Sequence, residues 1–416
     1  MPATSFKKSL EKFAEVVIKI GVNVQPGQRV LITPWTDSTE FVRLLTVQAY
    51  KAGASFVDVL WDDEPLRLTR VEHAPEDSFG YFSEWRRNAI IEAGKRGDAI
   101  IRMASPDPTL LLEQDADLVK AFQQAQMKQL QPYFDLVRSR GINWVGIGVP
   151  TARWAAKVFP DVPEEQRIEK MWEVIFKMCR ISTTDDPLAE WERHIANLAA
   201  RSLYFNQKKF TALKLTAPGT DLWIGLPEGQ QWLSARMDSI AGIPSVVNIP
   251  TEETFTAPHR TQVNGTVRAT KPLNVRGMMY IDKFSLTFKD GKVVEAKAEV
   301  GEEHLHNLLD TDENARYLGE IALVPHSSPI SQSGYLFLNT LYDENASCHI
   351  ALGSAYRFSI AGGEEMTPEE FEAAGGNSSL IHTDFMIGSS EMDIDGVTAD
   401  GKLEPVMREG EWSFEI

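Results

Sequence analysis

The sequence predicts an α/β N-terminal domain with a mostly parallel sheet, followed by a β-rich α+β C-terminal domain. Up to about residue 205, apolar strand-like runs alternate with helix-like stretches, and strands separated by helices form parallel sheets covered on both faces. Beyond that point, short strands and turn sequences replace the long helices. The 416 residues exceed one ordinary domain, so we expect domains at 1–205 and 206–416.

The N-terminal elements follow from hydrophobic periodicity. In residues 5–21, apolar side chains recur every three or four positions, which predicts an amphipathic helix. A strand at 29–33 ends at Pro34, and Ser38 can cap the helix that follows. The same alternation then predicts strands at 55–61, 98–103 and 143–149, and helices at 84–93, 115–138, 164–181 and 188–203.

The C-terminal half is expected to be mostly antiparallel. Asp290-Gly291 separates two strand-like runs, at 284–288 and 292–296, and this dipeptide is a strong hairpin signal. Asp400-Gly401 predicts a second hairpin. Further strands are expected at 210–215, 222–226 and 278–281.

Composition excludes several classes of protein. The formal net charge of −17 argues against a nucleic-acid partner, since such binding needs a clustered basic face. No N-terminal signal pattern or membrane-length apolar run is present, so we expect a cytoplasmic protein without a membrane partner. Cys179 and Cys348 lie far apart and cannot form a disulfide framework or a four-cysteine zinc site. Any metal must therefore be held mainly by His, Asp and Glu.

The pair His382 and Asp384 is the first candidate metal site. In a strand, side chains two residues apart point to the same face, so an imidazole nitrogen and a carboxylate would converge. The surrounding run is apolar, which makes the polar pair costly unless something neutralises it. A divalent cation would do so, and a histidine held in one tautomer by a carboxylate is the ordinary alternative.

Other segments of the C-terminal half offer ligands of the same kind. Glu252 and Glu253 must point to opposite faces if their segment is extended, so only one can line a given site. Glu320 opens an apolar strand, and His349 lies among small and apolar residues, with Tyr356 seven residues later. Each has an ordinary structural explanation, but together they match the ligands that suit a pair of divalent ions.

Charge balance favours two ions over one. Glu253, Glu320 and Asp384 contribute three negative charges against the four positive charges of two divalent ions, and a bridging hydroxide would cancel the remainder. A single ion would leave an excess anion buried.

Several ordered segments resemble the thermophilic-metalloprotease-type aminopeptidases, the family of aminopeptidases T and S. The resemblance extends along the whole chain, because an α/β half followed by a β-rich half is also the family's layout. It is carried by residues 250–258, 319–322, 344–353 with Tyr356, and 377–389.

The resemblance implies a metal-dependent aminopeptidase that removes N-terminal amino acids from peptides. It implies two divalent ions (Co, Zn, Mn or Mg), a homodimer, and substrates with a free N-terminus. One ion would polarise the scissile carbonyl while a hydroxide bridging both ions attacks it. Glu253, or Glu252 beside it, would carry the proton to the leaving amine, and Tyr356 would bind a metal or stabilise the oxyanion. The metal-site residues implied are Glu253, Glu320, His349, Tyr356, His382 and Asp384.

A second function stays open at this point: a nucleotide-binding α/β half joined to a C-terminal domain with a structural metal. Gly146 and Gly148 end a predicted strand, as glycines of a phosphate-binding loop do. The third glycine of the dinucleotide-binding pattern is absent, which counts against this alternative.

Overall fold

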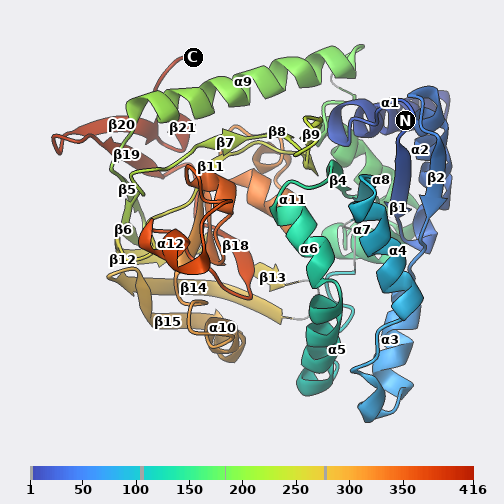
Figure 1. Cartoon of the computed structure of the whole chain (residues 1–416), viewed down its shortest axis with the longest axis horizontal. Coiled ribbons are helices and arrows are strands. Elements are labelled where there is room, and N and C mark those ends of the chain that lie inside the picture. Colours follow the sequence, from blue (N-terminus) through green and yellow to red (C-terminus); the bar gives the residue numbers. More distant parts are fainter. Residues whose placement is uncertain (1–2, 104–106, 183, 276–278) are drawn as a thin grey trace. The chain divides into compact units, whose positions relative to one another are not determined.

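The computed structural model describes residues 3–103, 107–182, 184–275 and 279–416 (Figure 1). Among these residues, a first compact unit takes the chain up to Arg193 together with Arg236–Pro250, and a second takes His194–Ala235, Thr251–Val275 and Met279–Ile416. The predicted boundary between residues 205 and 206 lies within α9 (Pro187–Lys208), and as a domain boundary it stays a prediction. No helix in the described part of the chain is both long and apolar enough to cross a membrane.

The first unit is built on a five-stranded sheet whose strand pairs are all parallel, as the sequence predicts. In spatial order its strands are β10 (Asn248–Ile249), β4 (Trp144–Ile147), β3 (Ala99–Met103), β1 (Arg29–Thr33) and β2 (Phe56–Val59). Gly146 fits the close approach of β10, because a Cβ there would lie 3.3 Å from the side-chain oxygen of Asn248. This glycine therefore has a packing role.

Helices pack against this sheet and against one another. Leu31 and Ile100 of the sheet share an apolar cluster with residues of α4 and α6, while α1, α2 and α8 share an aromatic cluster around Phe13. The helices are α1 (Ala3–Val16), α2 (Thr39–Lys51), α3 (Glu64–His73), α4 (Glu84–Lys95), α5 (Ala116–Gln129), α6 (Gln131–Arg138), α7 (Ala152–Val158) and α8 (Glu164–Met178). A short β8–β9 hairpin (Arg236–Asp238, Pro244–Val246) completes the unit.

The prediction of a single long helix at 115–138 is wrong. The structure has two helices there, α5 and α6, which are separated at Leu130. Pro132 lies in the first turn of α6. Proline lacks a backbone N–H and is tolerated only at the start of a helix, which explains why a new helix begins at this point. Periodicity alone did not reveal the break, because both helices keep an apolar face.

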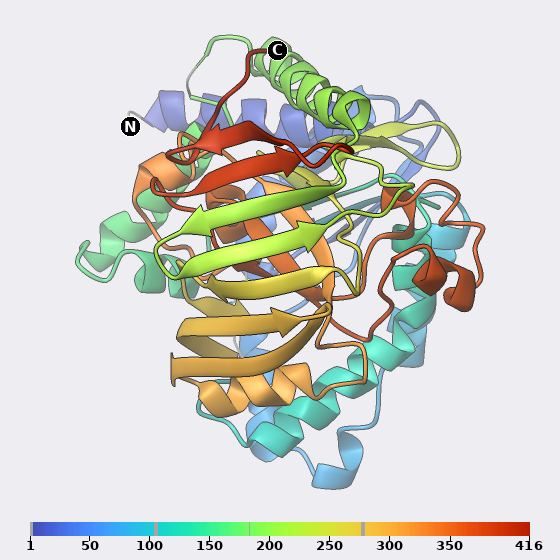
Figure 2. The same ribbon diagram turned by 90° about the vertical axis from the view of Figure 1, so that its left-hand side faces the viewer.

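The second unit contains a nine-stranded sheet, which Figure 2 shows face on. Its strands are antiparallel and include the hairpins predicted at Asp290-Gly291 and Asp400-Gly401. The predicted strands at 278–281 and 284–288 form one strand, β14, and Met278 lies outside the described residues. The strands are β13 (Leu273–Val275), β14 (Met279–Lys289), β15 (Lys292–Val300), β12 (Val263–Arg268), β6 (Thr220–Gly225), β5 (Ala212–Ala217), β19 (Asp393–Val397), β20 (Leu403–Arg408) and β21 (Glu411–Trp412).

A smaller five-stranded sheet packs on the large one. Leu222 and Leu286 of the large sheet belong to the same core cluster as Ile321, Ile350 and Phe385 of the small sheet, so the two sheets share one apolar core. In spatial order its strands are β18 (His382–Met386), β17 (His349–Gly353), β16 (Leu318–Leu323), β11 (Thr254–Thr256) and β7 (Leu233–Ser234); the unit's short helices are α10 (Glu302–Leu309), α11 (Thr340–Asp343) and α12 (Pro368–Ala373).

Candidate metal centre

Neighbouring strands of the small sheet carry polar side chains on one face. Glu320 in β16 and Asp384 in β18 both pair with Ala351 of β17, so the three residues lie in one row across the sheet. His349 and His382 are two residues away along their strands from Ala351 and Asp384, and therefore share that face. The opposite face of the same strands belongs to the apolar core. In β17, for example, His349 and Ala351 of the polar face alternate with Ile350 and Leu352 of the core.

Two alanines form the floor of this polar face. Ala351 lies in the row between Glu320 and Asp384, and Ala322 pairs with His349 on one side and Phe255 on the other. Both alanines are fully buried. Because a methyl group is the smallest side chain after glycine's hydrogen, these positions leave space between the polar groups, as a bound ion requires.

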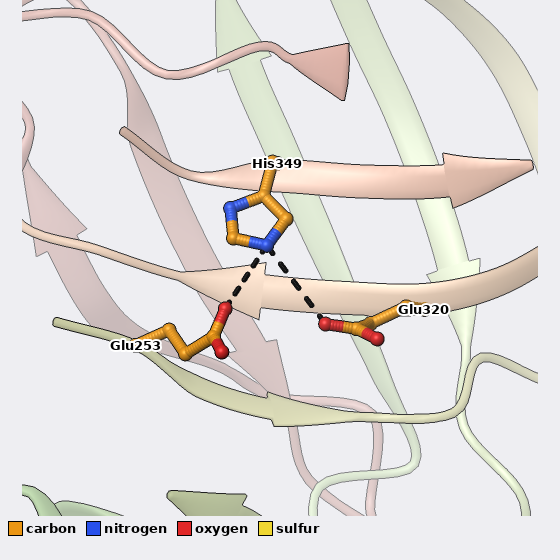
Figure 3. Close-up of side chains that lie close together, drawn as sticks. All are labelled: Glu253, Glu320 and His349. Carbon is orange, nitrogen blue, oxygen red and sulfur yellow. Dashed lines mark ion pairs between the residues drawn. The ribbon is translucent and has the colours of Figure 1, made fainter. Parts of the chain in front are cut away.

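The first polar group consists of Glu253, Glu320 and His349 and is called the inner group here (Figure 3). The Nε2 atom of His349 lies 3.1 Å from Oε2 of Glu253 and 3.8 Å from Oε1 of Glu320. Its Nδ1 atom lies 3.1 Å from the carbonyl oxygen of Ser347. When Nδ1 donates to that carbonyl, Nε2 keeps its lone pair and can bind a metal.

The second polar group, the outer group, consists of Glu320, His382 and Asp384. The Nε2 atom of His382 lies 3.4 Å from Oδ1 of Asp384 and 3.5 Å from Oε2 of Glu320. Its Nδ1 atom lies 2.7 Å from the carbonyl oxygen of Ser354, so this ring is oriented in the same way as that of His349. In each group, one ligand atom per residue lies within 4.8 Å of the others.

Glu320 belongs to both groups. Its Oε1 atom faces His349 and its Oε2 atom faces His382. A carboxylate in this position can bind two ions at once, one through each oxygen. The donors of both groups, imidazole nitrogens and carboxylate oxygens, suit zinc, cobalt and manganese, so the residues present fit a pair of divalent ions.

Several buried carboxylates lie close together in the two groups, and their negative charge raises the pKa values of the neighbouring side chains. Burial, followed by repulsion from Asp384, raises the pKa of Glu320 to about 8. Burial would lower the pKa of His349, but the hydrogen bond to Glu253 and nearby carboxylate charges raise it to about 10. For His382, Asp384 likewise outweighs burial and raises the pKa to about 10. Protons thus supply positive charge that bound cations would replace.

Tyr356 lies beside the outer group. Its ring centroid is 5.0 Å from that of His382, and the ring also stacks on Phe358 at a centroid distance of 5.0 Å. Burial, followed by the charges of Glu320 and Asp384, raises the pKa of its hydroxyl well above the usual value. The phenol therefore stays protonated at neutral pH and can donate a hydrogen bond.

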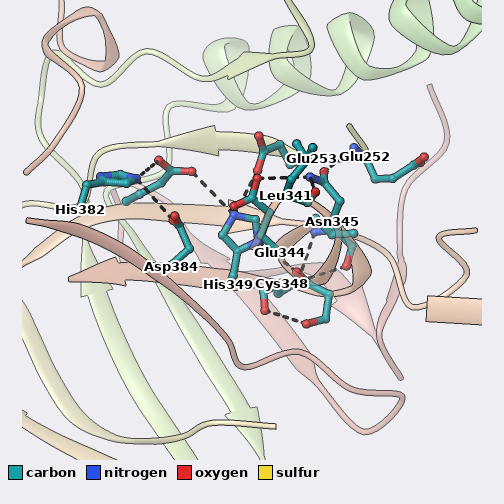
Figure 4. Close-up of polar contacts among 12 residues, drawn as sticks. Glu252, Glu253, Leu341, Glu344, Asn345, Cys348, His349, His382 and Asp384 are labelled. Carbon is teal, nitrogen blue, oxygen red and sulfur yellow. Dashed lines mark hydrogen bonds and ion pairs between the residues drawn. The ribbon is translucent and has the colours of Figure 1, made fainter. Parts of the chain in front are cut away.

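Glu252 and Glu253 diverge, as expected for neighbours in an extended segment. Glu253 faces His349, whereas Oε2 of Glu252 lies 3.7 Å from Nε2 of His194 in α9. Figure 4 shows the Glu252 carboxylate pointing away from His349. Of the two, only Glu253 belongs to a ligand group among the described residues.

Sequence reasoning missed one buried carboxylate, Glu344. It lies in a short helical turn, Glu344–Ala346, before β17, and its side chain is almost completely buried. Burial, followed by the charges of Asp384 and Glu253, raises its pKa well above the usual value. The one available signal was an acidic residue five positions before His349, and its direction depends on a turn that local periodicity does not predict.

Comparison with known proteins decides the family. The model of the thermophilic metalloprotease family (M29) matches residues 6–412. This chain belongs to that family. Aminopeptidase 2 of Geobacillus stearothermophilus is 44% identical over 411 residues, which cover 99% of both chains. Aminopeptidase T of Thermus thermophilus is 41% identical, over 98% of this chain and 99% of its own.

The M29 assignment extends to the three-dimensional fold. The solved structure of wild-type AmpT from Thermus thermophilus matches with a TM-score of 0.92 and 40% identity, over 98% of this chain and 100% of that one. The resemblance found in the sequence is therefore confirmed, as are the α/β N-terminal part and the β-rich part that follows it. As a member of M29, the chain is a metalloprotease, and its two histidine–carboxylate groups are the candidate metal site.

Proposed function

We propose that this chain is a metal-dependent aminopeptidase that holds two divalent ions, one in the inner group and one in the outer group. The observation that carries the proposal is the position of Glu320, whose two oxygens face two different histidines. A single-ion site does not need a carboxylate turned toward both. Relatives named as aminopeptidases along the full length support the peptidase assignment.

The charge of the site supports two ions. Glu253, Glu320, Asp384 and Glu344 are four buried or mostly buried carboxyl groups that influence one another's charge. Two divalent cations balance four carboxylates, whereas one cation leaves two anions uncompensated in a buried place. The balance expected from the sequence counted three carboxylates and a hydroxide, and in the structure Glu344 supplies the fourth negative charge in place of the hydroxide.

The roles of the side chains follow from their positions. Glu253, Glu320, His349, His382 and Asp384 would hold the ions, which supply a Lewis acid for the scissile carbonyl and lower the pKa of water. Tyr356 borders the outer group and would donate to the developing oxyanion or complete the metal coordination.

A buried carboxylate would carry the proton to the leaving amine. The position of Glu253 in the inner group supports it over Glu252, which faces His194. Glu344, whose charge interacts with Glu253, is the second carboxylate placed for this role.

The substrates proposed are peptides with a free N-terminus, since the relatives that match along the full length are named aminopeptidases. A panel of aminoacyl chromogenic substrates, with their N-acetylated counterparts, tests this in parallel with metal analysis. Chelation should abolish hydrolysis, two equivalents of Co, Zn, Mn or Mg should restore it, and acetylated substrates should resist cleavage. Hydrolysis that survives complete metal removal, or equal cleavage of acetylated substrates, would refute the proposal.

A homodimer belongs to the same proposal. Its support is the family resemblance of the whole chain. Light scattering of the purified protein tests it directly, and a mass near 46.6 kDa, that of one chain, would exclude it.

A further inference from the structure

Glu253 differs from the other members of the two groups in how its backbone is held. Glu320, His349, His382 and Asp384 lie within β16, β17 and β18, where ladder hydrogen bonds fix their positions. Glu253 precedes β11, whose pairing with β16 begins at Thr254. The small sheet therefore does not fix Thr251 and Glu252, the two residues before Glu253, and other contacts must do so.

Two side chains hold those residues. The Nε2 atom of His194 lies 2.8 Å from the carbonyl oxygen of Thr251, and the backbone N–H of Glu252 donates to Oδ1 of Asn345 at 2.7 Å. Asn345 is fully buried, and Figure 4 shows it beside Glu252 and Glu344. The contact with Asn345 joins Glu252 to the turn that leads into β17, where His349 begins the strand.

The amide of Asn345 uses both of its ends. Oδ1 accepts from Glu252, while Nδ2 donates to the carbonyl oxygen of Leu341 at 3.0 Å and lies 3.5 Å from Oε1 of Glu344. An amide side chain presents its acceptor and its donor on two separate atoms, and the loss of the acceptor removes this hydrogen bond from the buried N–H of Glu252. One side chain thus ties the residue before Glu253 to the segment that carries Glu344 and His349.

We propose that Asn345 is a positioning residue that holds Glu253 against His349 and thereby sets the affinity of the inner group for its ion. The inference rests on the two-ion site proposed above. The proposed role of Asn345 concerns the inner group alone, because all ligands of the outer group lie in strands of the small sheet. Residues that orient metal ligands typically contribute about 10- to 100-fold to metal affinity.

The test is a metal titration of the full-length chain, stripped of metal and followed by calorimetry and by the absorption spectrum of Co²⁺. Asn345→Ala should weaken one of the two binding events by about 10- to 100-fold and leave the other within about threefold. In the His382→Ala background, where the outer group is disabled, the remaining event should be the one that Asn345→Ala weakens. Equal weakening of both events, or of neither, would overturn the proposal.

Ser328→Ala is the matched control. The Ser328 hydroxyl is also buried and donates to the backbone oxygen of Asn345 at 3.0 Å, so its loss removes a hydrogen bond at the same residue without touching Glu252. This variant should bind both ions as the wild type does. If it weakens the inner event as strongly as Asn345→Ala, the effect is general loosening and the positioning role is refuted.

Asn345→Asp keeps the inference testable if the alanine variant does not fold. It retains the acceptor for the Glu252 N–H, but it replaces the donor with a charged oxygen that faces the carbonyl of Leu341 and Oε1 of Glu344. Because the contact with Glu252 is kept, the inner event of a folded Asn345→Asp chain should weaken by less than about tenfold relative to wild type. Weakening of about 100-fold in this variant would contradict anchoring through Glu252. A wild-type chain that binds a single ion would instead refute the two-ion function. The positioning role would then be tested by whether Asn345→Ala weakens the binding of that single ion.

Discussion

The inner and outer groups use the same kinds of ligand but differ in access to solvent. The side chain of His349 is 1% exposed, whereas that of His382 is 25% exposed. Glu344 adds a buried carboxylate near the inner group, and Tyr356 lies against the outer one. Closed sites hold structural ions and open sites meet substrates, so we expect a slowly exchanging inner ion and an outer ion that contacts the substrate.

The largest expected effect comes from the residue that the groups share. Glu320→Gln should lower the affinity of both groups, because each loses a charged oxygen, and kcat/KM should fall on the order of 10⁴-fold, or about 5.5 kcal/mol. Metal content by mass spectrometry and peptide hydrolysis measure this together. Glu252→Gln is the control, since this buried carboxylate faces His194 and its loss should leave both ions bound. A Glu320→Gln variant that retains two ions at wild-type affinity would remove the shared-ligand argument.

Separate histidine variants should divide the two groups. His382→Ala should lose the outer ion and reduce kcat by roughly 10²- to 10³-fold, while it keeps a buried inner ion that a chelator strips slowly. His349→Ala should keep only the exposed ion, which a chelator strips quickly. Stripping rates measured by a colorimetric chelator decide the point. Equal rates in the two variants would mean that exposure does not distinguish the groups.

The dependence of metal affinity on pH should also differ between the first and second ions. The pKa values near 10 for both histidines and near 8 for Glu320 lie above neutral pH, so each group holds a proton that a cation must displace. Binding therefore strengthens as pH rises toward 8 and weakens as it falls. Because Glu320 gives up its proton to whichever ion binds first, the affinity for the first ion should depend more steeply on pH than the affinity for the second. Calorimetric titrations at several pH values test the two slopes, and equal slopes would contradict the sharing of Glu320.

Strand alternation made part of this site accessible from the sequence. The period of two in β18 brings His382 and Asp384 to one face, as predicted for an isolated pair. It also showed that Glu252 and Glu253 must diverge, but not which of them enters the site. That choice depends on how β11 pairs with β16, a contact between segments more than 60 residues apart in the chain.

The features that escaped sequence reasoning depend on tertiary structure. Glu344 and Asn345 lie in a turn with no periodic pattern, and their directions are set by contacts with distant segments such as Glu252. The shared role of Glu320 depends on its place between two strands. In the N-terminal part, parallel pairing followed from the alternation of strands and helices, whereas the break at Leu130 depended on how a single proline was accommodated.

The smallest expected effect comes from the two alanines of the floor, Ala351 and Ala322, which lie next to different groups. Ala351→Val adds two methyl groups between Glu320 and Asp384 and should weaken the outer ion about tenfold, whereas Ala322→Val, beside His349, should weaken the inner ion by a similar factor. Valine favours strands, so the sheet should persist, and thermal unfolding of the metal-free variants reports any general strain. Metal titration should then show a weakened outer event in Ala351→Val and a weakened inner event in Ala322→Val. If either substitution weakens both ions alike, the floor is not divided between two ions, and the inner and outer groups act as one site.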